Sequence, residues 1–182
     1  MNYYQGCIKR HLYVFGADKR YLAKSPSHTP RIKTLLQYFP GCRFIYMLRD
    51  PLDTNASTIT LFKQFKKIFH SSFETDLITD QVLILADIWY KYPLITCKSF
   101  LGKSVYVVLF RDLVSKPFNV VRDLYVRLGL ELSPRFEKVL LQYEQRTANY
   151  KTTNQYSPGE FGLTKEAMHD RYFFVYKDFI GI

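Results

Sequence analysis

Three short apolar runs, each followed by a candidate helix, constrain the fold of this chain most strongly. The runs cover residues 21–23, 44–48 and 105–109 and are bounded by polar or turn-forming residues, as is typical of strands buried on both faces of a sheet. Strands that alternate with helices favour parallel pairing, because each helix returns the chain to the edge where the next strand begins. The sequence therefore predicts an α/β fold, with a parallel sheet flanked by helices.

Proline and glycine bound the helices that we expect between and after these strands. Pro30 and Pro51 stand where the first turn of a helix tolerates proline, and Gly129 is a natural stop between two later helices. The expected helices cover residues 30–38, 51–69, 76–99, 117–128, 134–143 and 163–176, the last one entered at Thr164. A chain of 182 residues has the length of one domain, so we expect a single domain over residues 1–182.

The chain is strongly basic, with a formal charge of +10 and a pI near 9.5. Such a balance favours an anionic ligand or partner, which could be a nucleotide, a nucleic acid, a polyanionic glycan or an anionic membrane. We find no RNA-recognition signature and no zinc-finger spacing. A nucleic-acid or membrane-surface protein therefore ranks below the nucleotide-binding interpretation developed next.

Cysteine and histidine give no sign of a disulfide framework or a metal site. The three cysteines are widely spaced without a Cys-x-x-Cys pair, and the four histidines have no ligand spacing. We also find no signal-peptide core and no stretch near the roughly 20 apolar residues of a membrane span. These observations predict a cytoplasmic protein that uses no metal.

The most informative stretch runs from the strand at residues 44–48 into Arg49, Asp50 and Pro51, and then into a helix that contains Ser57. An arginine at the carboxyl end of a parallel strand faces the ligand crevice of an α/β sheet, and its fork can hold a phosphate. Ser57 follows eight residues later, about two helical turns on, so its hydroxyl could share that phosphate. The alternative is a surface salt bridge from Arg49 to Asp50 or Asp53.

This stretch resembles the 3′-phosphate-binding motif of the sulfotransferase family, in which a strand ends in Arg-Asp-Pro and a serine follows at this spacing. Upstream, Lys24-Ser25-Pro26-Ser27-His28 resembles the family's Lys-Ser-Pro-x-His segment, 25 residues before Arg49. Downstream, residues 108–113, 124–130 and 156–163 resemble three further family segments. The likeness covers roughly residues 15–176 and implies the P-loop-NTPase-like sulfotransferase fold.

The resemblance implies transfer of a sulfonate from 3′-phosphoadenosine 5′-phosphosulfate (PAPS) to a hydroxyl or amine. Arg49 and Ser57 match the 3′-phosphate ligands, and Phe110 replaces the tyrosine that packs near the adenine. Lys24 matches the catalytic lysine, the cation near the bridging oxygen; the alternative for it is a solvated loop lysine. We carry no catalytic base over to His28. The partners implied are the nucleotide donor and an unidentified glycan, small-molecule or protein acceptor.

The sequence also departs from the family at the 5′-phosphosulfate, because it contains no loop rich in Gly, Ser and Thr that could cradle this group. We therefore expect the first strand and this loop to be missing, and the sheet to have an unpaired edge that favours self-association. The alternative to an active sulfotransferase is a non-catalytic or decayed relic that keeps the nucleotide-binding half of the fold.

Overall fold

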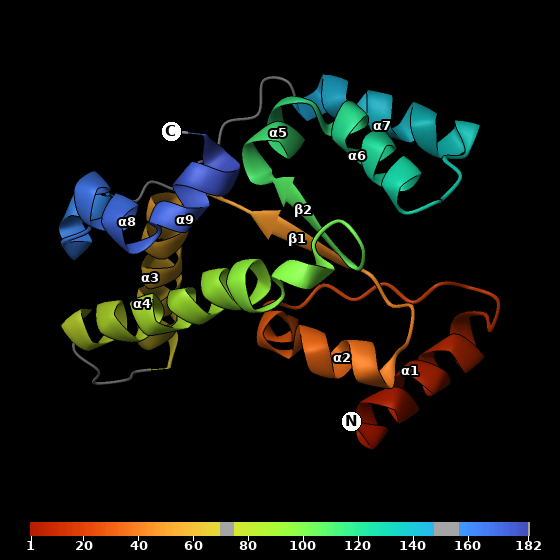
Figure 1. Cartoon of the computed structure of the whole chain (residues 1–182), viewed down its shortest axis with the longest axis horizontal. Helices are drawn as coiled ribbons and strands as arrows, with labels where there is room; N and C mark the ends of the chain where they lie inside the picture. The colour runs from red at the N-terminus through yellow and green to blue at the C-terminus, as the bar shows by residue number, and fades with distance from the viewer. Residues whose placement is uncertain (70–74, 148–156, 182) are drawn as a thin grey trace. The chain divides into compact units, whose positions relative to one another are not determined.

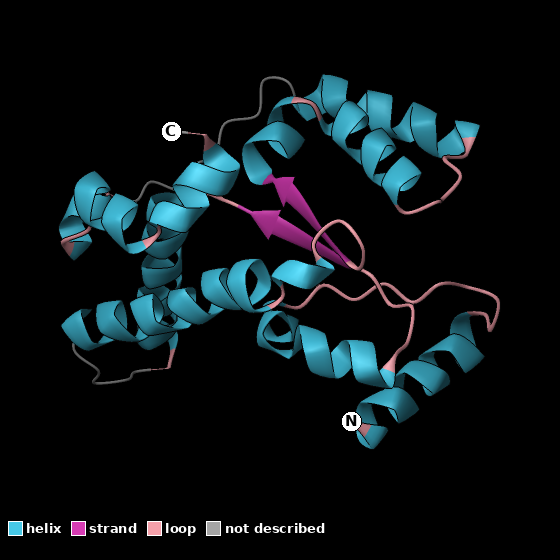
Figure 2. Ribbon diagram, in the orientation of Figure 1, coloured by secondary structure: helices cyan, strands magenta, loops and turns pink. Residues whose placement is uncertain are grey.

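The computed structural model describes residues 1–69, 75–147 and 157–181, which are mostly helical and include one pair of strands (Figure 2). The chain divides into two compact units, Met1–Cys42 and Arg43–Ile182. The strands β1 (Phe44–Leu48) and β2 (Val105–Leu109) both lie in the second unit and pair in parallel. The parallel sheet and the α/β class predicted from the sequence are confirmed.

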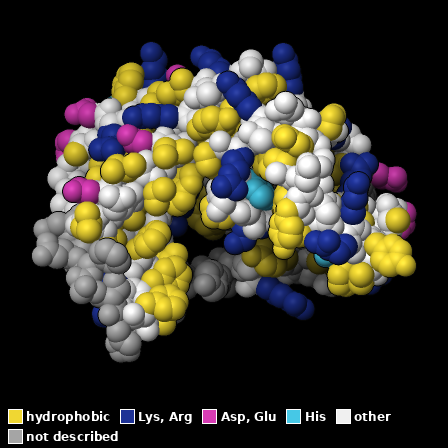
Figure 3. Space-filling view, turned by 90° about the horizontal axis from the view of Figure 1, so that it is seen from below, with side chains coloured by type: hydrophobic (Ala, Val, Ile, Leu, Met, Phe, Trp, Pro, Cys, Tyr) yellow, Lys and Arg dark blue, Asp and Glu magenta, His cyan; other side chains and the backbone are white. Residues whose placement is uncertain are grey.

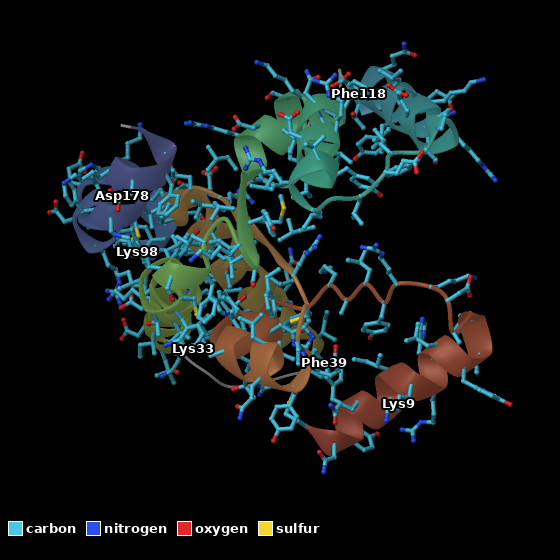
Figure 4. All side chains as sticks on the ribbon, turned by 45° about the vertical axis from the view of Figure 1, so that its right-hand side comes forward. Lys9, Lys33, Phe39, Lys98, Phe118 and Asp178 are labelled. Carbon is cyan, nitrogen blue, oxygen red and sulfur yellow. The ribbon has the colours of Figure 1, made fainter. Side chains whose placement is uncertain are left out.

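The first unit contains α1 (Asn2–Phe15), a 3-10 helix (Pro26–Arg31) and α2 (Ile32–Tyr38). Phe39, directly after α2, packs edge-on against Tyr4 of α1 with 6.0 Å between the ring centroids (Figure 4). The sequence reasoning missed α1, which is followed by Gly16 but has no side-chain cap at its start, no acidic residue in its first turn and no basic residue in its last turn.

The strand expected at residues 21–23 is wrong. These residues form no regular element and pair with no strand among the residues that the structure describes, and the side chain of Leu22 is 86% exposed. Three apolar residues give too weak a signal to distinguish a buried strand from an extended loop, because both periodicity and length are undefined at that size. The sheet in the described residues therefore has two strands.

In the second unit, each strand leads directly into a helix at its carboxyl end. The helix α3 (Pro51–Ile68) follows β1 after two residues, with proline at its first position and Asp50 as its N-cap. The short helix α5 (Phe110–Ser115), which we did not predict, follows β2 without a gap. The strands are in register from Phe44 opposite Val105 to Leu48 opposite Leu109, so both strand-to-helix junctions lie at the same edge of the sheet.

Three further helices of this unit lie where the sequence predicts them, although α4 ends earlier than expected and α7 continues four residues further. The helices are α4 (Thr75–Lys91), α6 (Pro117–Arg127) and α7 (Pro134–Thr147), and α5, α6 and α7 follow one another beyond β2 (Figure 1). The helix expected to reach residue 99 ends at Lys91 and continues as a π-helical turn (Tyr92–Thr96) and a 3-10 turn (Lys98–Phe100). Pro93, which has no N–H to donate, interrupts the regular hydrogen-bond ladder there.

The C-terminal segment closes the core of the second unit. It consists of a 3-10 turn (Pro158–Phe161), α8 (Lys165–Arg171), α9 (Phe173–Val175) and a π-helical turn (Tyr176–Ile180). The side chain of Thr164 caps α8 as predicted, accepting a hydrogen bond of 3.1 Å from the amide of Ala167. Within the described ranges, none of the helices combines the length and apolarity needed to cross a bilayer.

One hydrophobic core joins β1, α3, α4 and the C-terminal segment. Its fully buried members include Leu48, Ile59, Val82 and Tyr172. The core thus includes the last residue of β1, directly before the strand-to-helix junction. Lys and Arg side chains recur over the molecular face drawn in Figure 3, whereas Asp and Glu are sparse there, in keeping with the net charge of +10.

Candidate functional site

Arg49 and Phe110 lie side by side at the carboxyl edge of the sheet. Each follows the last residue of its strand, and these last residues, Leu48 and Leu109, are register partners. The guanidinium carbon of Arg49 lies 5.3 Å from the centroid of the Phe110 ring, within the range of a cation–π contact. The ring of Phe110 is 39% exposed and therefore presents aromatic surface at this edge.

Ser57 lies on the same face of α3 as Asp53, which forms an ion pair with Arg49. A guanidinium nitrogen of Arg49 (Nη2) lies 3.6 Å from a carboxylate oxygen of Asp53 (Oδ2). Residues 49, 53 and 57 are spaced by four, so Ser57 lies one turn beyond Asp53 on one stripe of the helix. The Ser57 side chain is half-buried, and its hydroxyl makes no hydrogen bond within the described part of the chain.

The ion pair between Arg49 and Asp53 is the alternative that the sequence left open, and it is weak. Both side chains are substantially exposed, at 32% and 51%, and exposed pairs of this spacing typically contribute about 0.3–0.5 kcal/mol. An incoming phosphate could displace Asp53, because a dianion with several acceptor oxygens matches the guanidinium fork better than a carboxylate oxygen at 3.6 Å. The pair is thus compatible with an anion site.

Asp50 is engaged by groups other than the Arg49 guanidinium. One of its carboxylate oxygens (Oδ1) accepts hydrogen bonds from the Leu52 amide at 2.8 Å and from the Tyr176 hydroxyl at 3.0 Å. The hydroxyl of Tyr90 donates to the backbone carbonyl of Arg49 at 2.9 Å. The sequence reasoning did not find these roles of Tyr90 and Tyr176, because no local pattern signals contacts between residues 41 and 126 positions apart.

Lys24 belongs to the first unit, whereas Arg49, Ser57 and Phe110 belong to the second. The side chain of Lys24 is exposed and lies in an extended segment just before the 3-10 helix Pro26–Arg31. The catalytic role expected from its motif stays a prediction. His28, to which no role was assigned, makes a side-chain hydrogen bond of 3.1 Å to the hydroxyl of Tyr4.

A separate hollow of about 200 Å³ lies between β2 and α6. Its polar lining consists of Asp112, Asp123 and Arg127, among apolar side chains of both elements. Two carboxylates beside one guanidinium do not favour an anion. None of the four site residues predicted from the sequence lines this hollow, and no group of three metal-ligating side chains occurs in residues 1–69, 75–147 and 157–181.

Comparisons with known proteins agree with the motif resemblance. The model of the sulfotransferase family matches residues 3–134, more than half of the chain. The chain is 33% identical over 146 residues to the omega-hydroxy-beta-dihydromenaquinone-9 sulfotransferase Stf3 of Mycobacterium bovis, and equally to that of Mycobacterium tuberculosis. These matches cover 77% of this chain and 36% of each relative, so the chain spans about a third of the length of these curated relatives.

A solved structure shares the fold. The crystal structure of sulfotransferase STF9 from Mycobacterium avium superimposes with a TM-score of 0.74, at 21% identity, over 86% of this chain and 41% of that one. The structural likeness supports the predicted sulfotransferase fold independently of the motifs. The matched family model and the 33% identity together show that this chain belongs to the sulfotransferase family.

Proposed function

We propose that this chain binds the 3′-phosphoadenosine part of PAPS and serves the transfer of its sulfonate to a hydroxyl or amine acceptor. The observation that carries the proposal is the Arg49 guanidinium lying over Phe110 at the carboxyl edge of a parallel sheet. Open α/β sheets bind their ligands at that edge. Membership of the sulfotransferase family supplies the reaction class.

The proposed 3′-phosphate site combines a cation, a hydroxyl and an aromatic surface. Arg49 would hold the phosphate through two parallel N–H donors, and Ser57 would add a hydroxyl donor from the next turns of α3. The Phe110 ring restricts the guanidinium from one side, and its exposed area offers a surface for the adenine. No metal is needed for this recognition, since the positive charge comes from the protein.

In the proposed reaction the acceptor oxygen or nitrogen attacks sulfur in line with the bridging oxygen of the donor. A new bond to sulfur forms, the bond from sulfur to the bridging oxygen breaks, and its electron pair stays on the departing 3′-phosphoadenosine 5′-phosphate. The acceptor proton passes to a base, which we do not assign. Lys24 would neutralise the charge that develops on the bridging oxygen.

The names of the relatives favour a hydroxyl as the first acceptor class to test. The mycobacterial Stf3 proteins are named as sulfotransferases of omega-hydroxy-beta-dihydromenaquinone-9. A hydroxyl on an apolar molecule is accordingly the acceptor we propose, ahead of an amine. The alternative is nucleotide binding without transfer, which predicts saturable binding of the nucleotide and no transfer of its sulfonate.

The edge of β1 supports the further proposal that the chain self-associates. Among the described residues β1 has a single partner strand, β2, and its side chains Ile45 and Met47 are each 40% exposed. An uncovered strand edge with apolar neighbours is a template for pairing with another chain. Another copy of this chain could occupy it.

The decisive test of the activity is a transfer assay with the donor labelled in its sulfonate. Purified chain is incubated with PAPS and with matched apolar alcohols and amines, and labelled products are separated from the donor. We expect label on alcohols, and its loss in Lys24→Ala. Nucleotide binding without label transfer to any acceptor would contradict the enzymatic proposal and support the binding alternative.

A further inference from the structure

The turn between β1 and α3 carries the proposed phosphate-binding arginine, and two buried tyrosines from distant parts of the chain hold it. Tyr90 at the end of α4 donates to the Arg49 carbonyl at 2.9 Å, and Tyr176 of the C-terminal segment donates to the Asp50 carboxylate at 3.0 Å. They are 41 and 126 residues away from their acceptors. The sheet edge alone therefore does not determine the conformation of this turn.

Both tyrosines are rigidly placed. Their side chains are 3% and 5% exposed for Tyr90 and Tyr176, respectively, and belong to the hydrophobic core. The ring of Tyr90 also packs on that of Tyr172, at 5.0 Å between centroids. Burial of each hydroxyl raises its pKa above the ordinary value, so both stay protonated and act as donors. Each ring is thus held in the core, and its hydroxyl binds one residue of the turn: Tyr90 binds Arg49, and Tyr176 binds Asp50.

The hydrogen bond from Tyr176 also restricts where the negatively charged Asp50 carboxylate can lie. Asp50 directly follows Arg49, so a freely rotating Asp50 carboxylate could reach toward the guanidinium or repel a bound phosphate. The hydrogen bonds from Leu52 and Tyr176 both act on the same oxygen of Asp50 and keep this carboxylate at the N-terminus of α3. Removing the Tyr176 hydroxyl would leave the Leu52 amide as the one recorded donor among the described residues.

We propose that Tyr90 and Tyr176 are positioning residues for the phosphate site at Arg49: Tyr90 fixes the backbone that carries the guanidinium, and Tyr176 keeps the Asp50 carboxylate away from the phosphate. The proposal rests on the proposed function, because it requires that Arg49 binds the 3′-phosphate. It adds residues that touch no nucleotide, and it makes α4 and the C-terminal segment necessary for nucleotide selectivity.

The test compares two nucleotides that differ only in the 3′-phosphate. Dissociation constants of 3′-phosphoadenosine 5′-phosphate and adenosine 5′-phosphate are measured by calorimetry for the whole chain, and their ratio reports the contribution of the 3′-phosphate. We expect Tyr90→Phe and Tyr176→Phe each to lower this ratio by roughly three- to tenfold, the size of one hydrogen bond's effect. The affinity for adenosine 5′-phosphate should change little.

The matched control is Tyr106→Phe. The hydroxyl of Tyr106 donates to the Lys103 carbonyl at 2.8 Å, its side chain is 8% exposed, and it lies near the other end of β2. This variant loses a comparable buried hydrogen bond and should be destabilised to a similar extent in a urea titration. We expect Tyr106→Phe to keep the wild-type ratio of the two dissociation constants. If the tyrosine variants acted only by destabilising the fold, Tyr106→Phe would lower this ratio as well.

Each outcome separates this inference from the proposed function. If the wild-type chain prefers the 3′-phosphorylated nucleotide but both tyrosine variants keep the full ratio, the positioning roles are wrong and the phosphate site stands. A fall of equal size in Tyr106→Phe would also overturn them, in favour of general destabilisation. If the wild-type chain does not distinguish the nucleotides, the phosphate site itself is wrong and the positioning roles fall with it.

Discussion

Among the described residues, Phe110 and Asp53 contact the Arg49 side chain and have opposite effects on an anion. The ring of Phe110 presents its negative face to the guanidinium without using an N–H donor, whereas the Asp53 carboxylate lies 3.6 Å from one guanidinium nitrogen. Asp53 also places a negative charge beside the position expected for the phosphate. Affinity for a nucleotide at this site is thus a balance that single substitutions can shift in either direction.

We expect Asp53→Asn to bind 3′-phosphoadenosine 5′-phosphate more tightly, by roughly two- to fivefold, since it removes both the competing ion pair and the repulsion. Calorimetry measures the change. Asp123→Asn is the control, because Asp123 is another exposed carboxylate near an arginine, Arg122, at 3.9 Å. Weaker binding by Asp53→Asn would mean that the carboxylate instead orients Arg49.

Lys24 should matter for the chemical step and little for nucleotide affinity. Its motif implies a cation at the bridging oxygen, where charge develops only as the bond breaks. We expect Lys24→Ala to reduce the rate of sulfonate transfer by roughly a hundredfold, the usual size for loss of one such stabilising group. Lys33→Ala, an exposed lysine of α2 in the same unit, is the control. Equal rates for Lys24→Ala and Lys33→Ala would rule out the assigned role.

Ion pairs and core contacts connect the helices, and the link between α4 and α8 predicts a pH dependence. Arg171 of α8 donates two hydrogen bonds to the Asp87 carboxylate, at 2.9 and 3.2 Å, and Lys91 donates a third at 2.9 Å. Burial opposes the ionisation of Asp87, but these hydrogen bonds outweigh it and hold the pKa of the carboxyl below its ordinary value.

Because the pKa of Asp87 is lower in the folded chain, its stabilising effect is complete above the unfolded value of about 3.9 and is lost as the pH falls through the folded value. Urea titrations should therefore show wild type more stable than Asp87→Asn at pH 7 and at pH 5, with the gap narrowing below roughly pH 4. Asp80→Asn, an exposed change on the same helix, should show no such gap. A gap that persists unchanged at pH 3 would refute the ion-pair explanation.

The edge of β1 predicts a concentration-dependent assembly. A lysine on an edge strand blocks pairing with another chain, because its charge would have to be buried in the new sheet. We expect Ile45→Lys to shift the sedimentation profile toward the monomer relative to wild type. Ile84→Lys, also an exposed isoleucine but on α4, should not. Monomeric wild-type chain at all accessible concentrations would contradict self-association through this edge.

The elements that the sequence predicts correctly are those with strong local signals. Two five-residue apolar runs became strands, and proline at the first helical position marked α3, α6 and α7. The three-residue run at 21–23 carried no such signal, and α1 had neither an N-terminal side-chain cap nor terminal charges to reveal it. Local pattern also located Arg49 and Phe110, since both follow predicted strands.

The contacts of Tyr90 and Tyr176 could not be predicted, because they depend on how distant elements pack.

For the whole molecule, charge is unevenly distributed along the chain. The first unit, Met1–Cys42, contains seven Lys and Arg residues and a single Asp. Such a surface attracts anions over distances near the Debye length of about 10 Å at moderate ionic strength. Part of the affinity for any nucleotide will therefore be general attraction, and a test of the specific site needs a control that removes an equal charge elsewhere.

The chain offers such a control in Arg122 of α6. Its guanidinium also lies over a phenylalanine ring, that of Phe118 at 5.5 Å, and beside a carboxylate, that of Asp123 at 3.9 Å. Arg49→Ala and Arg122→Ala thus remove the same charge, and each removes a cation–π contact and an ion pair. They differ in that Arg49 follows a strand of the parallel sheet, whereas Arg122 lies within a surface helix.

Calorimetric titration of wild type, Arg49→Ala and Arg122→Ala with 3′-phosphoadenosine 5′-phosphate tests the central claim most directly. We predict saturable one-to-one binding by wild type, a loss of roughly a hundredfold in Arg49→Ala, and a change of less than about twofold in Arg122→Ala. Folding of all three is checked by circular dichroism. Equal losses in the two variants, or wild-type affinity in a folded Arg49→Ala, would contradict the claim that Arg49 forms the 3′-phosphate site.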